Sequence, residues 1–165
     1  MPEIDYVVPG IVVSQTDTVV DLRELYKVVK DWFNHQKYDI LEKEHLKRGP
    51  KDLFIKWENE KRMDDYVMFK FKVELSIANQ EDVIVEVSGK ERKKQKADVK
   101  FYIETFMEKD YEDRWSKTPM QQFLRGFFDR FVIVGKMKRY EDELEKLTYV
   151  FRDELKSYLR LQKLK

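Results

Sequence analysis

Pairs of acidic side chains are the first candidates for chemistry in this sequence. Asp64 and Asp65 are adjacent, and Glu58 and Glu60 are two positions apart. Two carboxylates can serve as general acid and general base when their surroundings separate their pKa values. The chain has 32 acidic residues, so such pairs arise from composition alone, and Asp64 and Asp65 also suit a turn. We therefore predict no catalytic residue among them.

The remaining reactive residue types do not form a recognisable site either. His35 and His45 have no suitably spaced acidic or histidine partner, and a metal site needs three or four converging ligands. The five glycines are too scattered for a phosphate loop, and there is no nucleophile-elbow serine motif. The chain has no cysteine, which excludes a thiolate nucleophile. We predict no metal site and no cofactor.

The most cationic stretch of the chain consists of Lys90, Arg92, Lys93, Lys94 and Lys96. We expect these residues at a flexible hairpin tip, where five cations could bind a phosphate backbone or an acidic partner. Aromatic residues for base stacking do not alternate with them. The net charge of +1 adds no overall attraction to nucleic acid. Nucleic-acid binding is therefore an alternative function and not the first choice.

The elements that would position these groups centre on residues 66–77, where apolar and polar side chains alternate. Successive side chains of a strand point to opposite faces, so this stretch predicts a long strand with one buried face. Short turns between the strands leave no room for parallel crossovers, which predicts an antiparallel meander of four or five strands. Further strands are predicted around 38–46, 53–57, 83–87 and 99–107, with turns at 48–51, 64–65 and 78–82.

Helical spacing of apolar residues appears on both sides of the meander. A helix is predicted over about 18–37, with Asp17 or Thr18 as N-cap, after a short strand at 7–14 that Pro9 and Gly10 interrupt. After the meander, Thr118-Pro119 is typical of a helix start. A phenylalanine-rich stripe over 123–131 follows, then a break or kink near Gly135 and a terminal helix of about 25 residues.

The whole chain, 1–165, is predicted to be a single α+β domain. Its sheet is an antiparallel meander covered by an N-terminal helix and a long C-terminal helix. The longest strongly apolar run, Phe131–Val134, is far shorter than the roughly 20 residues of a membrane span. The first residues lack the features of a signal peptide. Together with the absence of cysteine, these features favour a cytoplasmic protein without a membrane span.

This order of elements resembles the helix-grip architecture of the START and Bet v 1-like superfamily. In that superfamily a curved antiparallel sheet wraps a long terminal helix, and the gap between them often holds an apolar ligand. The chain has one predicted strand fewer and one long first helix where the superfamily has two short ones. Separately, a set of short segments resembles a group of uncharacterised archaeal proteins, which implies no activity. The segments are Lys56-Trp57-Glu58 with Lys61, Asp64-Asp65-Tyr66, Glu108–Tyr111 and Phe123–Gly126.

We expect a non-catalytic binding module in one of two forms. In the first, a small apolar ligand lies between the sheet and the C-terminal helix. In the second, the interior is filled and a protein partner, including another copy of the chain, docks on an apolar helix face. Nucleic-acid binding through Lys90–Lys96 is the alternative, and a cyclase or hydrolase on a helix-grip fold is the second alternative. The predicted ligand contacts are Trp57, Phe69, Phe71, Val99, Phe101 and Phe151.

Overall fold

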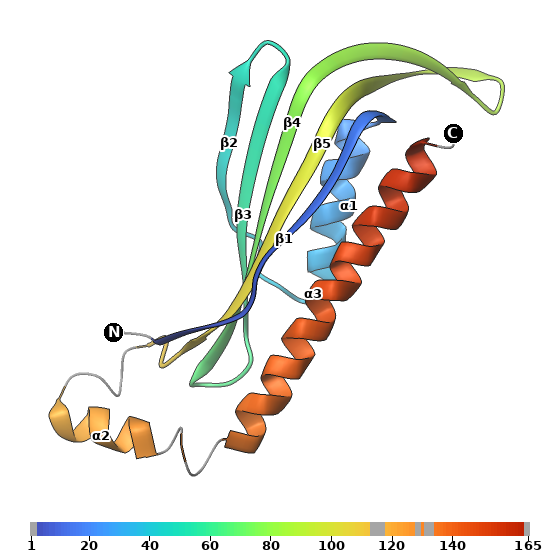
Figure 1. Cartoon of the computed structure of the whole chain (residues 1–165). Coiled ribbons are helices and arrows are strands. Elements are labelled where there is room, and N and C mark those ends of the chain that lie inside the picture. The colour runs from blue at the N-terminus through green and yellow to red at the C-terminus, as the bar shows by residue number, and fades with distance from the viewer. Residues whose placement is uncertain (1–2, 113–117, 128–129, 131–133, 164–165) are drawn as a thin grey trace.

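The computed structural model describes residues 3–112, 118–127, 130 and 134–163 (Figure 1). These residues form one sheet and three helices. In chain order the elements are β1 (Glu3–Val20), α1 (Leu22–His35), β2 (Glu42–Gly49), β3 (Asp52–Arg62), β4 (Val67–Val87), β5 (Lys90–Lys109), α2 (Pro119–Phe127) and α3 (Val134–Lys163).

The sheet has five antiparallel strands in the order β1-β5-β4-β3-β2. Strands β2 to β5 form the predicted meander, and β1 pairs with the last strand, so β1 and β2 are the two edges. Both α1 and α3 lie over the same, concave face of the sheet, and α2 lies apart near the N-terminal end of β1 (Figure 1). The predicted α+β class, with an antiparallel sheet covered by an N-terminal and a long C-terminal helix, is confirmed.

Strand β4 is much longer than its predicted counterpart. The turn predicted at 78–82 is wrong, because β4 continues through a register shift between Ala78 and Glu81 and turns only after Val87. Asn79 lies at this shift with φ of 55°, a left-handed conformation that asparagine tolerates better than most residues. A bulge of this kind bends the strand and increases its twist. Beyond it, the β4–β5 hairpin bends over the C-terminal end of α3 (Figure 1).

A second bulge extends β1 in the same way. The register of β1 against β5 shifts between Gln15 and Thr18, where Asp17 has φ of 55°. Asp98 of β5 joins the two bulges: it accepts hydrogen bonds from the backbone N–H of Asp17 and from Nδ2 of Asn79, both at 2.8 Å. These bonds favour the ionised carboxylate and lower the pKa of Asp98. The bending of the sheet is therefore anchored at one side chain of β5.

The extension of β1 also moves the start of α1. The predicted helix over 18–37 is wrong at its first turn, because Thr18 and its neighbours belong to β1. The helix is capped instead by Asp21, whose side chain accepts the backbone N–H of Arg23 at 3.0 Å and of Glu24 at 3.2 Å. An aspartate N-cap satisfies two of the free N–H groups at the helix start.

The buried core lies between the concave face and the two covering helices. In the central strand every second side chain from Val67 to Ile77 is apolar and at most 2% exposed. Met68, on the opposite face of the strand, is buried as well. Aromatic rings from three elements meet at Phe151 of α3, whose centroid lies 4.7 Å from Trp32, 5.1 Å from Phe33 and 5.4 Å from Phe71. Dense aromatic contact therefore attaches both helices to the sheet.

The start of α2 agrees with the prediction. Thr118 Oγ1 accepts the backbone N–H of Gln121 at 3.2 Å, as an N-cap does, and Pro119 is the first helical residue. A break was predicted near Gly135, and Gly135 lies in the first turn of α3. Most of the segment 128–133, including Phe131, lies outside the described residues.

Candidate ligand groove between β1 and α3

The six residues predicted to contact a ligand are all packed into the core. None is more than 1% exposed, and all six belong to one continuous apolar cluster. Phe151 lines a cavity between α1 and α3 of only about 10 Å³, room for one water at most. Their structural role is therefore packing between sheet and helices, and a ligand contact by these residues stays a prediction.

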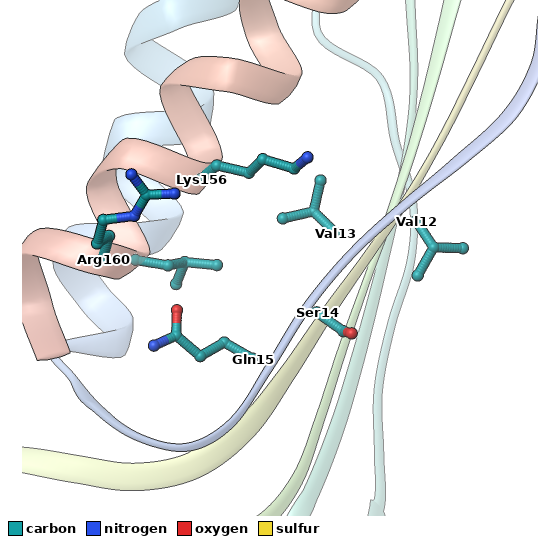
Figure 2. A pocket seen from close by; sticks show the side chains of 7 residues that line it. Val12, Val13, Ser14, Gln15, Lys156 and Arg160 are labelled. Carbon is teal, nitrogen blue, oxygen red and sulfur yellow. The ribbon is translucent and has the colours of Figure 1, made fainter.

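A much larger hollow lies where α3 passes the edge strand β1 (Figure 2). Its volume is about 480 Å³, within the range of small-molecule sites. Val13 of β1 and Leu159 of α3 are both at most 4% exposed and form its apolar floor. The lining residues are Val12, Val13, Ser14, Gln15, Lys156, Leu159 and Arg160. We call this hollow the β1–α3 groove.

The local structure of both elements explains which side chains enter the groove. Along β1 the side chains alternate, so Val13 and Gln15 point toward α3 while Val12 and Ser14 point away (Figure 2). On α3, Lys156 and Arg160 are four residues apart and share one face of the helix. The groove thus places two cations and one amide around an apolar floor.

The two cations of the groove have no carboxylate partner among the described residues. No ion pair or side-chain hydrogen bond joins Lys156 or Arg160 to the residues that the structure describes. Two like charges at this spacing on a helix repel each other by a few tenths of a kcal/mol. An anion lying between them would remove that repulsion and accept charge-assisted hydrogen bonds.

The backbone of β1 adds further hydrogen-bonding groups beside the groove. Because β1 is an edge strand, one side of its backbone has no partner strand in the part of the chain that the structure describes. Such an edge can bind polar groups of a ligand. Sequence reasoning missed all of these residues. The only available signal was the pair Lys156 and Arg160 beside the apolar position Leu159, and the opposing strand could not be deduced from it.

The structure does not bring the five cations of 90–96 together at a flexible tip. The tight turn of the hairpin is at Ser88 and Gly89, and Lys90–Lys96 is regular strand at the start of β5, so the predicted tip is wrong. Lys94 is 8% exposed and contacts Gln162 Oε1 of α3 at 3.5 Å. Lys93 pairs with Asp82 at 3.2 Å and Lys96 with Asp17 at 3.5 Å, while Lys90 and Arg92 are exposed.

Carboxylates of both acidic pairs, Glu58 with Glu60 and Asp64 with Asp65, take part in ion pairs or hydrogen bonds that hold the fold together. Glu58 and Glu60 lie on the convex face of the sheet and pair with lysines of neighbouring strands, among them Lys70 and Lys72. Asp64 lies at the predicted turn between β3 and β4 and accepts the backbone N–H of Tyr66 and Val67, each at 2.8 Å. Its Oδ2 also accepts the Tyr140 hydroxyl at 3.0 Å and contacts Lys136 Nζ at 2.8 Å. Asp64 therefore attaches the first turns of α3 to the β3–β4 turn.

We expect Asp64→Asn to lower the free energy of unfolding at neutral pH and to make that free energy fall less steeply as the pH is lowered. Burial tends to raise the pKa of Asp64, but bonds from Lys136, the backbone and Tyr140 outweigh it and lower the pKa. A lowered folded pKa stabilises the protein above the unfolded value near 3.8, and this contribution is lost as pH falls through the folded pKa. Urea denaturation between pH 7 and 3 measures both effects. The exposed neighbour provides the control Asp65→Asn, and equal effects of the two variants would contradict this role.

A second, smaller hollow lies between α1 and the β2–β3 hairpin. Its volume is about 280 Å³, and its lining is largely apolar, with Tyr26 and His45 at its border. Glu42 accepts the Tyr26 hydroxyl at 2.7 Å and lies 2.8 Å from His45 Nδ1. Burial, and then the bond to Glu42, raise the pKa of Tyr26 to about 12. The prediction that His45 has no spaced acidic partner is therefore wrong, while His35 is exposed at the end of α1.

Comparison with protein-family models, with curated proteins and with solved structures gives no match for this chain. Among the described residues, no helix combines the length and the apolar character needed to cross a membrane.

Proposed function

We propose that this chain is a non-catalytic binding protein that holds a small amphipathic anion in the β1–α3 groove. The observation that carries the proposal is the pair Lys156 and Arg160, without a carboxylate partner in the described residues, above an apolar floor. Such an arrangement suits a ligand with a carboxylate, sulfate or phosphate at one end and a short hydrocarbon part at the other. The ligand lies between sheet and C-terminal helix, as in the first predicted form, but at the edge of the sheet.

The proposal includes a relationship to helix-grip proteins, an archaeal source and a cytoplasmic location. A curved antiparallel sheet with a long terminal helix along its concave face supports the first of these (Figure 1). Fold likeness locates no site, so the groove and not the architecture carries the functional argument.

The test is calorimetric titration with octyl sulfate, kept below its micelle concentration. We expect Lys156→Glu and Arg160→Glu each to weaken binding by at least about tenfold, because a hydrogen bond to a charged group contributes roughly 1.5–3 kcal/mol. The matched control is Lys146→Glu, an exposed lysine on the same helix outside the groove, which should bind like the unmodified protein.

The charge of the probe provides the second arm of this test. Octyltrimethylammonium has the same hydrocarbon chain and the opposite charge, so it should bind at least about tenfold more weakly than octyl sulfate. Equal binding of both probes, or equal weakening by the variants at 146 and 156, would refute the groove as an anion site.

Two other classes of function remain as alternatives. Nucleic-acid binding would rely on Lys90 and Arg92, which are exposed on the projecting hairpin, since the other three cations of that stretch have partners or are buried. A cyclase or hydrolase activity would need a desolvated acid or base. Glu42 and His45 are in contact beside the second hollow, but both are exposed, so this contact does not supply one.

A further inference from the structure

The two edges of the sheet differ in how they are protected against pairing with a further strand. Strand β2 forms one edge, and five of its eight residues are charged. Charged side chains along an edge oppose the addition of another strand. Strand β1 forms the other edge, and its residues 11–15, Ile-Val-Val-Ser-Gln, carry no charge. The edge beside the β1–α3 groove therefore lacks the protection that the opposite edge has.

Residues 11–15 of β1 are also regular enough to accept another strand. Their register against β5 is unbroken from Ile11 opposite Ile103 to Gln15 opposite Val99, and register shifts lie on either side. In an antiparallel strand successive residues direct their N–H and C=O groups to alternate sides, so every second residue offers both groups to the free edge. The described residues place no strand along that side. A segment of about five residues, roughly 17 Å long, can therefore pair there.

The two cations of the groove select the chemistry of such a segment. Lys156 and Arg160 lie on α3 beside the part of β1 that carries Val13 and Gln15 (Figure 2). They are four residues apart, which corresponds to about 6 Å along the helix axis. Two residues of a strand advance by about 7 Å, and their side chains point to the same face. Acidic side chains two positions apart in an added strand therefore match the spacing of the two cations.

A second copy of the chain does not supply this pattern through its own free edge. Residues 11–15 contain no carboxylate, so pairing of two β1 edges would bring no anion to Lys156 or Arg160. The side chain between the two acidic positions of an added strand would lie on the other face of the sheet. Val12 points to that face and is 53% exposed, so an apolar β-branched residue suits this middle position.

We propose that the β1–α3 groove binds an extended acidic peptide, which adds a sixth strand to the sheet along residues 11–15 of β1. Two of its carboxylates, at alternate positions, pair with Lys156 and Arg160. In strand addition the main-chain hydrogen bonds supply affinity and the alternating side chains supply selectivity. The inference rests on the proposed function, because it uses the same groove and the same cations, and it identifies the carrier of the anion as a peptide segment.

Fluorescence anisotropy with the full chain and the labelled, end-capped peptide Thr-Val-Glu-Val-Glu-Val-Thr tests the proposal. Both glutamates of this peptide lie on one face of an extended chain. The control peptide Thr-Val-Glu-Glu-Val-Val-Thr has the same composition, but its glutamates lie on opposite faces. It should bind at least about tenfold more weakly, because only one glutamate reaches a cation. Equal affinity of the two peptides would overturn the proposal.

N-methylation of the peptide, at one residue at a time from the second to the sixth, tests the backbone pairing. Each methyl group removes one N–H donor, so every second methylated peptide should bind at least about tenfold more weakly. The peptides methylated at the positions between should bind like the unmodified one. A profile that does not alternate would refute the added strand. Octyl sulfate reports on the groove separately: its binding beside such a profile would leave the proposed function intact, whereas failure of both ligands would refute the groove itself.

Reversal of the two charges on α3 tests the selection of an acidic peptide. The double variant Lys156→Glu with Arg160→Glu should prefer Thr-Val-Lys-Val-Lys-Val-Thr over the glutamate peptide by at least about tenfold. Binding of the lysine peptide would also show that the variant is folded. The control Lys146→Glu, outside the groove, should keep the preference of the unmodified protein. A double variant that still prefers the glutamate peptide would contradict the assigned pairing.

Discussion

Replacing Phe151 by alanine will lower the free energy of unfolding by about 3–5 kcal/mol, the usual cost of removing a buried phenylalanine. Phe151 is 1% exposed and contacts aromatic rings of α1 and β4 at the same time. Its loss leaves a cavity beside one of about 10 Å³ that already exists. Such a void is costly because rings from three elements cannot all move into it. Urea denaturation followed by circular dichroism measures the change.

The neighbouring position provides the control for this experiment. Val150 is 38% exposed on the same helix, and Val150→Ala should change the free energy of unfolding by less than about 1 kcal/mol. A Phe151→Ala variant that is no less stable than Val150→Ala would show that α3 is not held to the sheet by this aromatic cluster. The architecture would then have to be revised at α3.

Replacing Thr148 by valine will cost about 1–3 kcal/mol, and the cost will largely disappear when Thr105 is replaced as well. Both hydroxyl groups are fully buried between α3 and β5, 3.0 Å apart. Thr148 donates its single proton to the carbonyl oxygen of Leu144 at 2.6 Å, so Thr105 must be the donor to Thr148. Thr148→Val therefore leaves a buried donor without a partner.

The direction of these bonds makes the two single variants unequal. Thr105→Val leaves Thr148 bonded to Leu144, so it should cost less than Thr148→Val, about 0.5–1.5 kcal/mol. The double variant replaces both hydroxyls by methyl groups of similar size and should lie within about 1 kcal/mol of the unmodified protein. Denaturation of all four proteins gives the coupling free energy. Additive costs, or a larger cost for Thr105→Val, would contradict the assigned direction.

The sequence predicted a strand or a helix start correctly where the structure depends on a few neighbouring residues. The alternation over 66–77 predicted a buried strand, and the same residues form the centre of the sheet. Thr118-Pro119 predicted a helix start, which is observed. Errors arose where β-bulges interrupt the alternation, because the left-handed conformation of Asn79 and Asp17 is stabilised by Asp98 on another strand. From the sequence alone, a polar stretch such as 78–82 looks like a turn, because the hydrogen bond to Asp98 that makes it a bulge cannot be seen.

The sequence by itself determined the α+β class, the antiparallel meander and the helices that cover it, because side-chain periodicity and turn chemistry act over a few neighbouring residues. Only the tertiary structure decided which side chains fill the core and which line a groove. Lys156 and Gln15 lie 141 positions apart in the chain and line the same groove only because β1 forms the edge that α3 passes. That juxtaposition depends on the curvature set by two bulges and on aromatic packing around Phe151, which are contacts between distant parts of the chain.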